Sequence, residues 1–167
     1  MFLTKINLKR IKMEKIDALN QVAKFHKTFK HPILETPQIP SSLRSELRVS
    51  LLQEELNELK EAIEANDIVE IADALCDIQY VLSGAVLEFG LGEKFIELFN
   101  EVQRSNMSKA CKTMEEAEKT VAHYKKTKHV SAHIEEEDGV FLVYRDGDKK
   151  TLKSVNYSPA DLKGILK

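Results

Sequence analysis

The amino-acid sequence predicts a mainly α-helical fold with a small C-terminal β-meander and a short terminal helix. Three observations support this fold class. Apolar residues recur at helical spacing over most of the chain, three of the four prolines gather in one loop, and two Asp-Gly pairs interrupt an apolar run near the C-terminus. The length of 167 residues suits one domain, and 43% hydrophobic residues are enough to form a core.

The first half of the chain predicts three helices. The first covers residues 13–29 and ends at a proline-rich loop, residues 30–42, because proline does not continue a helix. The second covers residues 42–65, and an apolar stripe along it is expected to face the core. The stripe comprises Leu52, Leu56, Leu59 and Ile63. The third runs from its N-cap Asp67 to Phe89 and is apolar on all sides, which predicts a buried helix.

The second half predicts two further helices, followed by β structure. We expect helices at residues 93–104 and 114–126, and the first of them is clearly amphipathic. Residues 130–152 are rich in β-branched and aromatic side chains around the Asp-Gly turns, which predicts the meander. Ser158-Pro159 is expected to start the terminal helix, with serine as N-cap and proline at the first helical position.

These elements suggest three parts of the chain. Residues 1–12 form an accessory N-terminal extension, and Met13 is an alternative start. Residues 13–128 form a helical domain, and residues 129–167 form the β-meander and terminal helix packed on that same domain. The longest uncharged run is ten residues, about half of what a membrane span requires, so no membrane partner is expected.

Composition excludes several classes of protein. Lys and Arg total 25 against 27 Asp and Glu, so the chain is not a generally basic nucleic-acid-binding protein. The two cysteines, Cys76 and Cys111, cannot form a disulfide framework, and neither has zinc-ligand spacing. We therefore expect no nucleic-acid partner and a reducing, cytoplasmic location.

Acidic residues without basic neighbours are concentrated in the middle of the chain. From Glu61 to Glu93 there are eight acidic residues and no Lys, Arg or His. Just before this stretch, Glu54, Glu55 and Glu58 form an EExxE pattern on the second helix. A solvated charged face explains that helix equally well, because glutamate-rich surfaces are common.

Three further carboxylates lie on the third helix, where burial is expected. Glu70, Asp73 and Asp77 share one face at spacings i, i+3 and i+7. Two carboxylates about 4 Å apart repel by roughly 4 kcal/mol at an effective dielectric of 20, and burial adds to this cost. A capping box with Asp67 explains Glu70 alone, and salt bridges to distant basic residues are another explanation. A divalent cation explains all three, and oxygen ligands without histidine favour Mg²⁺ or Mn²⁺.

A basic segment follows the fourth helix. A Mg²⁺ site suits a phosphate substrate, which also needs positive groups to hold it. The segment offers three cations and three hydrogen-bonding side chains: Arg104, Lys109, Lys112, Ser105, Asn106 and Ser108. A solvated helix end is the alternative explanation for this segment.

These residues together resemble the all-α nucleoside triphosphate pyrophosphatases, the superfamily of MazG, phosphoribosyl-ATP pyrophosphohydrolase and the dimeric dUTPases. The EExxE pattern followed by Glu70 and Asp73 is similar to the EExxE…ExxD motif of that superfamily. The runs EIADALCDIQYVLSGAVLEFGL, EVQRSNMSKA and DGDKKTLKSVNYSPADL extend the resemblance to about Ala23–Leu166.

The resemblance implies a four-helix-type core, present as a homodimer or a dimer of dimers, that binds Mg²⁺ or Mn²⁺. It implies hydrolysis of a (d)NTP, with dUTP or another noncanonical nucleotide as substrate, to a monophosphate and pyrophosphate. The alternatives are a phosphoribosyl-ATP or canonical-NTP pyrophosphohydrolase, or a metal- or nucleotide-binding module without turnover.

The resemblance also assigns roles to individual residues. The expected metal ligands are Glu55, Glu58, Glu70 and Asp73, and Glu54 is expected to bind metal or activate the attacking water. The expected phosphate-binding residues are Arg104, Asn106 and Lys109. Further candidates are Asp77, Lys153, Tyr157 and His26, and His26 either lines a base pocket with Phe25 and the proline loop or packs in the core.

Overall fold

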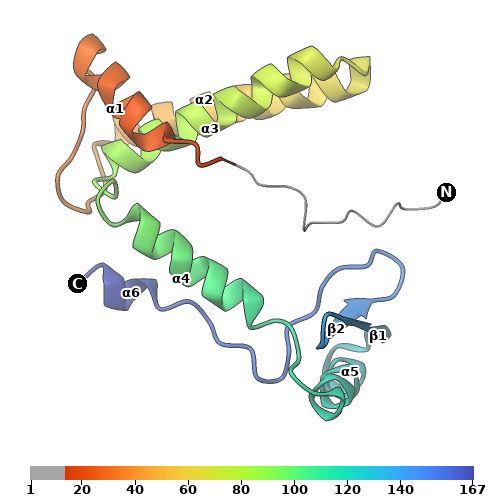
Figure 1. The fold of residues 1–167 in the computed structure, drawn as a ribbon. Coiled ribbons are helices and arrows are strands. Elements are labelled where there is room, and N and C mark those ends of the chain that lie inside the picture. Colours follow the sequence, from red (N-terminus) through yellow and green to blue (C-terminus); the bar gives the residue numbers. More distant parts are fainter. Residues whose placement is uncertain (1–13) are drawn as a thin grey trace. The chain divides into compact units, whose positions relative to one another are not determined.

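A computed structural model of the protein describes residues 14–167, so the expected extension at residues 1–12 and the start at Met13 lie outside the described residues. The elements in order are α1 (Ala18–Phe29), α2 (Ser42–Ala65), α3 (Ile68–Glu88), α4 (Phe95–Met107), α5 (Met114–Lys128), β1 (Ala132–Glu137), β2 (Val140–Arg145) and α6 (Leu162–Ile165). The predicted fold class, mainly helical with a small C-terminal β element, is confirmed (Figure 1). No helix among the described residues is long and apolar enough to cross a membrane.

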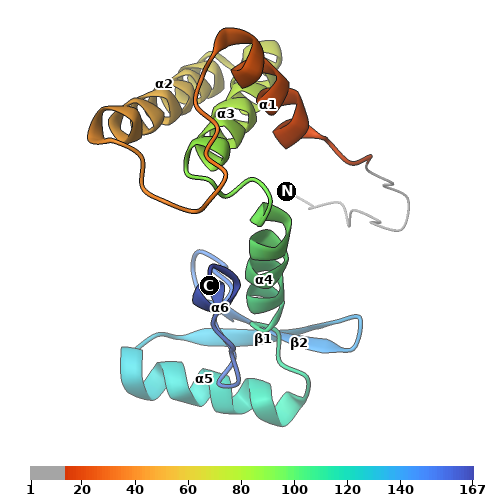
Figure 2. The ribbon, with the colours of Figure 1, turned by 90° about the vertical axis from the view of Figure 1, so that its left-hand side faces the viewer.

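The chain divides into two compact units, with the boundary after Glu93. In the first unit, α2 and α3 run side by side as a helical hairpin and α1 packs against α3 (Figures 1 and 2). Asn66 ends α2 in the left-handed conformation, and Asp67 begins α3 by accepting hydrogen bonds from the backbone N–H groups of Val69 and Glu70. The predicted break between the two helices is therefore the hairpin connection.

The proline-rich loop before α2 passes over the C-terminal end of α3. The Gln38 N–H donates to the Phe89 carbonyl at 3.1 Å. Gly90 has a positive φ of 68°, and a Cβ at this position would lie 1.9 Å from the Thr36 carbonyl oxygen. Glycine is therefore required where the loop and the end of α3 approach each other.

Charged and polar side chains join the helices of the first unit in its interior. The carboxylate of Glu88 is fully buried and forms ion pairs with Arg44 and Arg48 from α2. His26 of α1 is only 2% exposed, and its Nδ1 donates to the Pro32 carbonyl at 2.9 Å. Burying these groups is tolerable because each has a partner of opposite charge or a hydrogen bond.

Two predictions of burial in this unit are wrong. On α3, which we expected to be buried on all sides, Ile68, Val69 and Leu75 are 73%, 70% and 52% exposed. On α2, the stripe residues Leu56 and Ile63 are 49% and 54% exposed. The reason is that the helices of this unit cover only part of each other's surface, so apolar composition continues on to solvent-facing positions.

In the second unit, α5 packs against a two-stranded antiparallel sheet formed by β1 and β2 (Figure 2). Asp138 and Gly139 both have positive φ in the connecting turn, as the Asp-Gly pair predicts. The buried core comprises Cys111, Ala117, Val143 and Leu152. The chain after the second Asp-Gly pair returns to the sheet through a single bridge, between Tyr144 and Thr151, so the expected meander is reduced to a hairpin.

The terminal helix begins later than predicted. It covers Leu162–Ile165, and Asp161 caps it by accepting from the Gly164 N–H. Ser158-Pro159, the expected start, is extended instead: the Ser158 N–H donates to the Ser108 hydroxyl at 3.0 Å, and the Pro159 carbonyl accepts from Arg104. These contacts with α4 and the residue that follows it replace the first turn of the helix.

Candidate functional site

Carboxylates from α2 and α3 surround Glu55 in the first unit. Burial and the negative charges of Glu58, Asp77, Glu54 and Asp73 raise the pKa of Glu55 above its usual value. Its Oε2 atom is shielded from solvent and has no hydrogen-bond partner. A carboxylate placed in this way costs free energy when it is ionised, because its acidic neighbours repel the charge and one of its oxygens is shielded from water.

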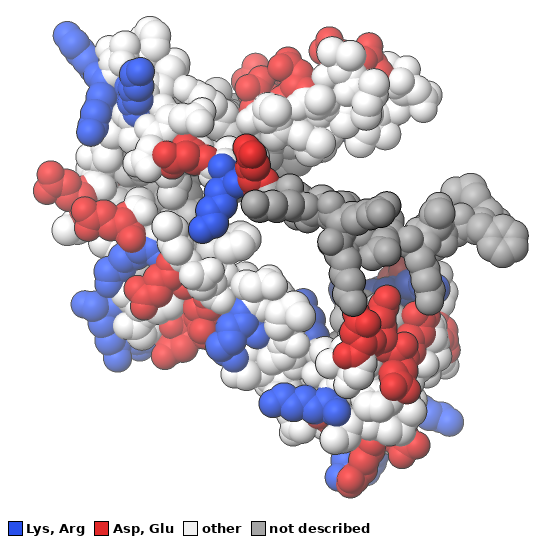
Figure 3. Space-filling view, in the orientation of Figure 1, with Lys and Arg blue, Asp and Glu red and all other residues white. Residues whose placement is uncertain are grey.

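No basic side chain of the described residues offsets this charge. The one ion pair on the C-terminal half of α2 within residues 14–167 is Lys60 with Glu64, and both are exposed. On the face drawn in Figure 3, the far end of the paired helices α2 and α3, at the upper right, shows acidic side chains and no basic one. The acidic group that we define as Glu54, Glu55, Glu58, Asp73 and Asp77 is thus uncompensated.

The predicted metal ligands differ in their exposure and in how strongly they act on Glu55. Glu54, Glu58, Glu70 and Asp73 are exposed, which corrects the expectation that the α3 carboxylates lie in a buried stripe. Asp77, only a further candidate from sequence, is among the four carboxylates that act most strongly on Glu55, whereas Glu70 is not. Across residues 14–167, no three His, Cys, Asp or Glu side chains lie close enough together to hold a metal ion.

The alternative explanation for Glu70, a capping box, is only half formed. Asp67 caps α3 through its carboxylate, but its own N–H donates to the Ala62 carbonyl at 3.0 Å rather than to Glu70. The Glu70 carboxylate therefore has no part in the cap.

The donor type of the acidic group suits a hard divalent cation, although among residues 14–167 its side chains do not converge on one point. Its donors are carboxylate oxygens alone, which suit Mg²⁺ or Mn²⁺, and one of those oxygens is buried without a partner. Glu55, Glu58, Asp73 and Asp77 are the residues that would hold the ion.

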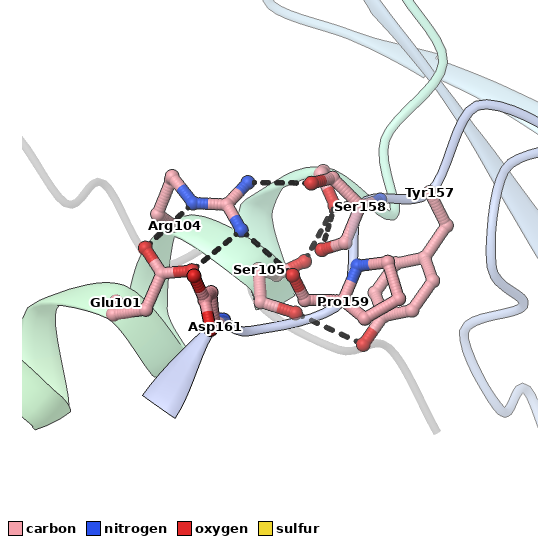
Figure 4. A network of polar contacts seen from close by, with 8 residues as sticks. Glu101, Arg104, Ser105, Tyr157, Ser158, Pro159 and Asp161 are labelled. Carbon is pink, nitrogen blue, oxygen red and sulfur yellow. Dashed lines mark hydrogen bonds and ion pairs between the residues drawn. The ribbon is translucent and has the colours of Figure 1, made fainter. Parts of the chain in front are cut away.

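In the second unit, Arg104 is engaged by the protein itself (Figure 4). Its guanidinium donates to both oxygens of Glu101 at 2.8 Å, to the Ser158 hydroxyl at 3.0 Å and to the Pro159 carbonyl at 3.0 Å. The hydrogen bonds from Arg104 and the Asp161 amide lower the pKa of Glu101 to about 2. Arg104, expected to bind phosphate, therefore ties the C-terminal segment to α4.

The other expected phosphate-binding residues gather near the end of α4. Lys109 Nζ donates to Asn106 Oδ1 at 2.8 Å, and Lys153 Nζ lies 4.2 Å from the centre of the Tyr157 ring. A hydrogen bond with Ser105 and the charges of Lys153 and Lys109 lower the pKa of Tyr157. We name Asn106, Lys109, Lys153 and Tyr157 the basic cluster.

His26 is placed for packing rather than for contact with a ligand. It is almost fully buried, and a Cβ on Gly84 would lie 3.0 Å from its Nε2. Its neighbour Phe25 stacks on His31 at 5.8 Å and meets the edge of Tyr80 at 5.5 Å. This arrangement favours the packing alternative for His26.

A pocket of about 460 Å³ lies between α1 and α3, and the sequence did not single it out. Its walls are mostly apolar, with the amides of Gln21 and Gln79 among them. The sequence signal that could have indicated this pocket is the presence of two amides, Gln21 and Gln79, on otherwise apolar helix faces. The Glu88 pairing was likewise missed, although Arg44 and Arg48 stand one helical turn apart and Glu88 is the lone acid of an apolar run.

Comparison with known proteins adds two findings. A sequence profile of the phosphoribosyl-ATP pyrophosphohydrolase family matches residues 22–106, about half of the chain. An uncharacterized protein of Acanthamoeba polyphaga mimivirus is 36% identical over 84 residues, which are 47% of this chain and 33% of the relative. The chain thus matches about a third of the length of that relative.

Proposed function

The chain belongs to the phosphoribosyl-ATP pyrophosphohydrolase family, and from this we propose that it is a divalent-metal-dependent enzyme that hydrolyses a nucleoside triphosphate to a monophosphate and pyrophosphate. The observation that carries the proposal is the buried, unpartnered Oε2 of Glu55 within an uncompensated acidic group. The matched range contains all of that group. A buried negative charge without an internal partner is a device for binding a cation rather than for stabilising the fold.

Each residue of the acidic group has a proposed role. Glu55, Glu58, Asp73 and Asp77 hold the cation, and Glu70, through its place in the motif, extends the set from the first turn of α3. When bound, a divalent cation neutralises phosphate charge and acidifies water. Glu54 is exposed beside Glu55 and accepts the proton of the attacking water.

The basic cluster in the second unit is proposed to bind phosphate oxygens. Lys109 and Lys153 supply positive charge, and the Asn106 amide and Tyr157 hydroxyl supply directed hydrogen bonds. Arg104 is left out of this role because four of its five N–H donors are already taken within the protein.

The base of the substrate is proposed to enter the pocket between α1 and α3. Its apolar walls suit a planar base, and the amides of Gln21 and Gln79 offer both donors and acceptors to the base edge. We propose dUTP or another noncanonical nucleotide as substrate. Gln79→Leu should then change the order of kcat/KM among nucleotides that differ in their base.

We also propose a homodimer in the reducing cytoplasm. Apolar side chains more than half exposed on α2 and α3, including Ile63, Ile68 and Val69, are unusual for a surface that stays in water. Light scattering after size exclusion should give twice the mass of one chain. The Ile68→Glu variant should give a lower mass, because a charge on this surface disfavours association. The free, exposed thiol of Cys76 is compatible with a reducing compartment.

The test of the activity is pyrophosphate release from a panel containing dUTP, the canonical (d)NTPs and phosphoribosyl-ATP, with Mg²⁺ or Mn²⁺. Glu58→Gln and Asp73→Asn should lower kcat/KM by more than about 100-fold, because each removes a cation ligand. Glu46→Gln, the same change at an exposed position on α2, should stay within about twofold. If metal and nucleotide bind but nothing is hydrolysed, the chain is a binding module and the proposal is wrong.

A further inference from the structure

Three side chains of α5 face the segment that carries half of the basic cluster. Glu116, Thr120 and Tyr124 are spaced at i, i+4 and i+8, so they lie in a row along one face of the helix. Residues 153–155 run beside this row after leaving the sheet. All of these residues lie beyond the range that the family profile matches.

Backbone donors of the segment are taken up by side chains of α5 instead of by a neighbouring strand. The Lys153 N–H donates to the Tyr124 hydroxyl at 3.1 Å, and the Val155 N–H donates to Thr120 Oγ1 at 3.1 Å. Thr120 is fully buried, and its own hydroxyl proton goes to the Glu116 carbonyl at 2.8 Å. Its oxygen is therefore free to accept the Val155 bond.

Between these two contacts, Ser154 is fixed from several directions. Its hydroxyl donates to Glu116 Oε1, its N–H donates to the Lys109 carbonyl at 3.2 Å, and its Oγ accepts the Asn156 N–H at 2.9 Å. Burial of Glu116 opposes ionisation, but hydrogen bonds from Ser154 and the Lys112 amide lower the pKa of Glu116 overall. An ionised acceptor makes the bond to Ser154 a strong one.

The segment held in this way determines where Lys153 and Tyr157 lie. The Tyr157 N–H donates to the Ser154 carbonyl at 2.9 Å, and the Tyr157 hydroxyl bonds to Ser105 at the end of α4. Lys153 then lies over the Tyr157 ring, and Lys109 is joined to the same segment through its carbonyl. Alternate residues are thus placed oppositely: Ser154 is buried against α5, and Lys153 is exposed, with its ammonium group over the Tyr157 ring.

We propose that Glu116, Thr120 and Tyr124 are positioning residues, which act through Lys153 and Tyr157 to make the basic cluster a binding site for a polyphosphate anion. The nucleotide identity of that anion rests on the proposed function, but binding of pyrophosphate alone does not. A preorganised pair of groups binds an anion more tightly because little conformational entropy is lost on binding.

The test uses the full chain and two nearly isosteric variants, Tyr124→Phe and Thr120→Val, each with a matched control. Tyr144→Phe removes a hydroxyl from the sheet, and Thr127→Val removes the same kind of bond to the carbonyl four residues before it without touching the segment. Pyrophosphate binding by calorimetry should weaken about three- to tenfold in the two variants, because each frees one backbone donor of the segment. The controls should stay within about twofold. Unfolding midpoints show whether each variant is folded.

Two further measurements separate positioning from general stability. Hydrogen exchange at the Lys153 and Val155 amides should become faster in the variants and not in the controls. In a Lys153→Met, Tyr157→Phe background, Tyr124→Phe should cause no further loss of pyrophosphate binding, because the two side chains through which it acts no longer contact the anion. An equal loss in that background overturns the proposal.

The outcomes distinguish this inference from the proposed function. If the wild-type protein binds pyrophosphate but hydrolyses no nucleotide, the proposed function fails, and the variant series still decides the inference. Faster amide exchange with unchanged pyrophosphate binding overturns the inference, and so does a wild-type protein that does not bind pyrophosphate at all.

Discussion

Glu88 and Glu55 are two acidic residues of the first unit with buried oxygens, and their pKa values shift in opposite directions. Burial raises the pKa of both carboxyls, but two arginines donate hydrogen bonds to Glu88 and lower its pKa overall. Around Glu55 the neighbours are themselves acidic, so their charges add to the effect of burial and raise its pKa further. Glu88 is fully buried and Glu55 only half-buried, but burial acts in the same direction on both pKa values, so the sign of the surrounding charge sets the direction of the overall shift.

The two sites differ in whether the fold itself supplies the opposite charge. At Glu88 the compensating cations are Arg44 and Arg48, which belong to the fold, so the charge of the carboxylate is offset there, although Nε of the buried Arg48 has no hydrogen-bond partner. At Glu55 no basic side chain among the described residues pairs with the carboxylate, and its neighbours are acidic. The same helix pair thus carries a paired ion cluster at one end and the uncompensated acidic group farther along.

The largest effect expected from this comparison is that of Glu88→Gln. Removing the charge leaves two arginines facing each other, one of them buried, and breaking a buried pair in this way costs about 3–5 kcal/mol. Urea unfolding monitored by circular dichroism should show that loss in the free energy of unfolding. Glu93→Gln, exposed and outside the cluster, should change it by less than about 0.5 kcal/mol. A loss under about 1 kcal/mol at Glu88 would mean that the cluster is not structural.

Glu55→Gln is expected to have the opposite sign. Without metal, the neutral amide relieves the repulsion and should stabilise the protein by on the order of 1 kcal/mol, while activity and metal binding are lost. Urea unfolding in a chelator measures the first effect, and pyrophosphate release measures the second. Glu70→Gln, at an exposed position, serves as the control and should bring no such gain. Equal stability of Glu55→Gln and wild type in the chelator would contradict the uncompensated charge.

The comparison also predicts opposite dependences on pH. Because the pKa of Glu55 is raised on folding, the protonated form stabilises the fold at low pH, and this contribution is lost as pH rises above the usual value of 4.5. The gain from Glu55→Gln should therefore be absent near pH 4 and grow toward about pH 7. Because the pKa of Glu88 is lowered, its contribution is present at neutral pH and lost as pH falls below 4.5. Metal-free unfolding of both variants across this range checks the two signs, and parallel curves would refute them.

The sequence predicted the helices well and their burial poorly, for a physical reason. Periodicity, Asn66-Asp67 and the Asp-Gly turns are local signals, and all of them mark real boundaries. Exposure depends on what other surfaces cover a helix, and composition does not contain that information, so the apolar surface of α3 was misjudged.

The candidate site shows the same division between local and distant information. The EExxE pattern located the α2 part of the acidic group, because Glu54, Glu55 and Glu58 share one helix. The start of the terminal helix was misplaced because Ser158 and Pro159 are held by Ser108 and Arg104, about fifty residues earlier in the chain. The row of α5 side chains beside residues 153–155 was missed for the same reason. The spacing of these side chains does not indicate a role unless the position of that segment is known.

A third carboxylate, Glu101, sharpens the comparison with the smallest expected effect. It is paired with Arg104 as Glu88 is paired with Arg44, and its pKa is lowered to about 2, but the arginine is half exposed. Solvent screens such a pair, so Glu101→Gln should destabilise the protein far less than Glu88→Gln does. Arg104→Lys should leave pyrophosphate binding within about twofold, whereas Lys109→Met should weaken it about tenfold, because the protein already engages four of the five N–H donors of Arg104 but only one of the three of Lys109. Calorimetric titration with pyrophosphate measures both. A tenfold loss in Arg104→Lys would return Arg104 to the phosphate-binding role that the sequence suggested and would show that pairing within the protein does not decide which charges act on a ligand.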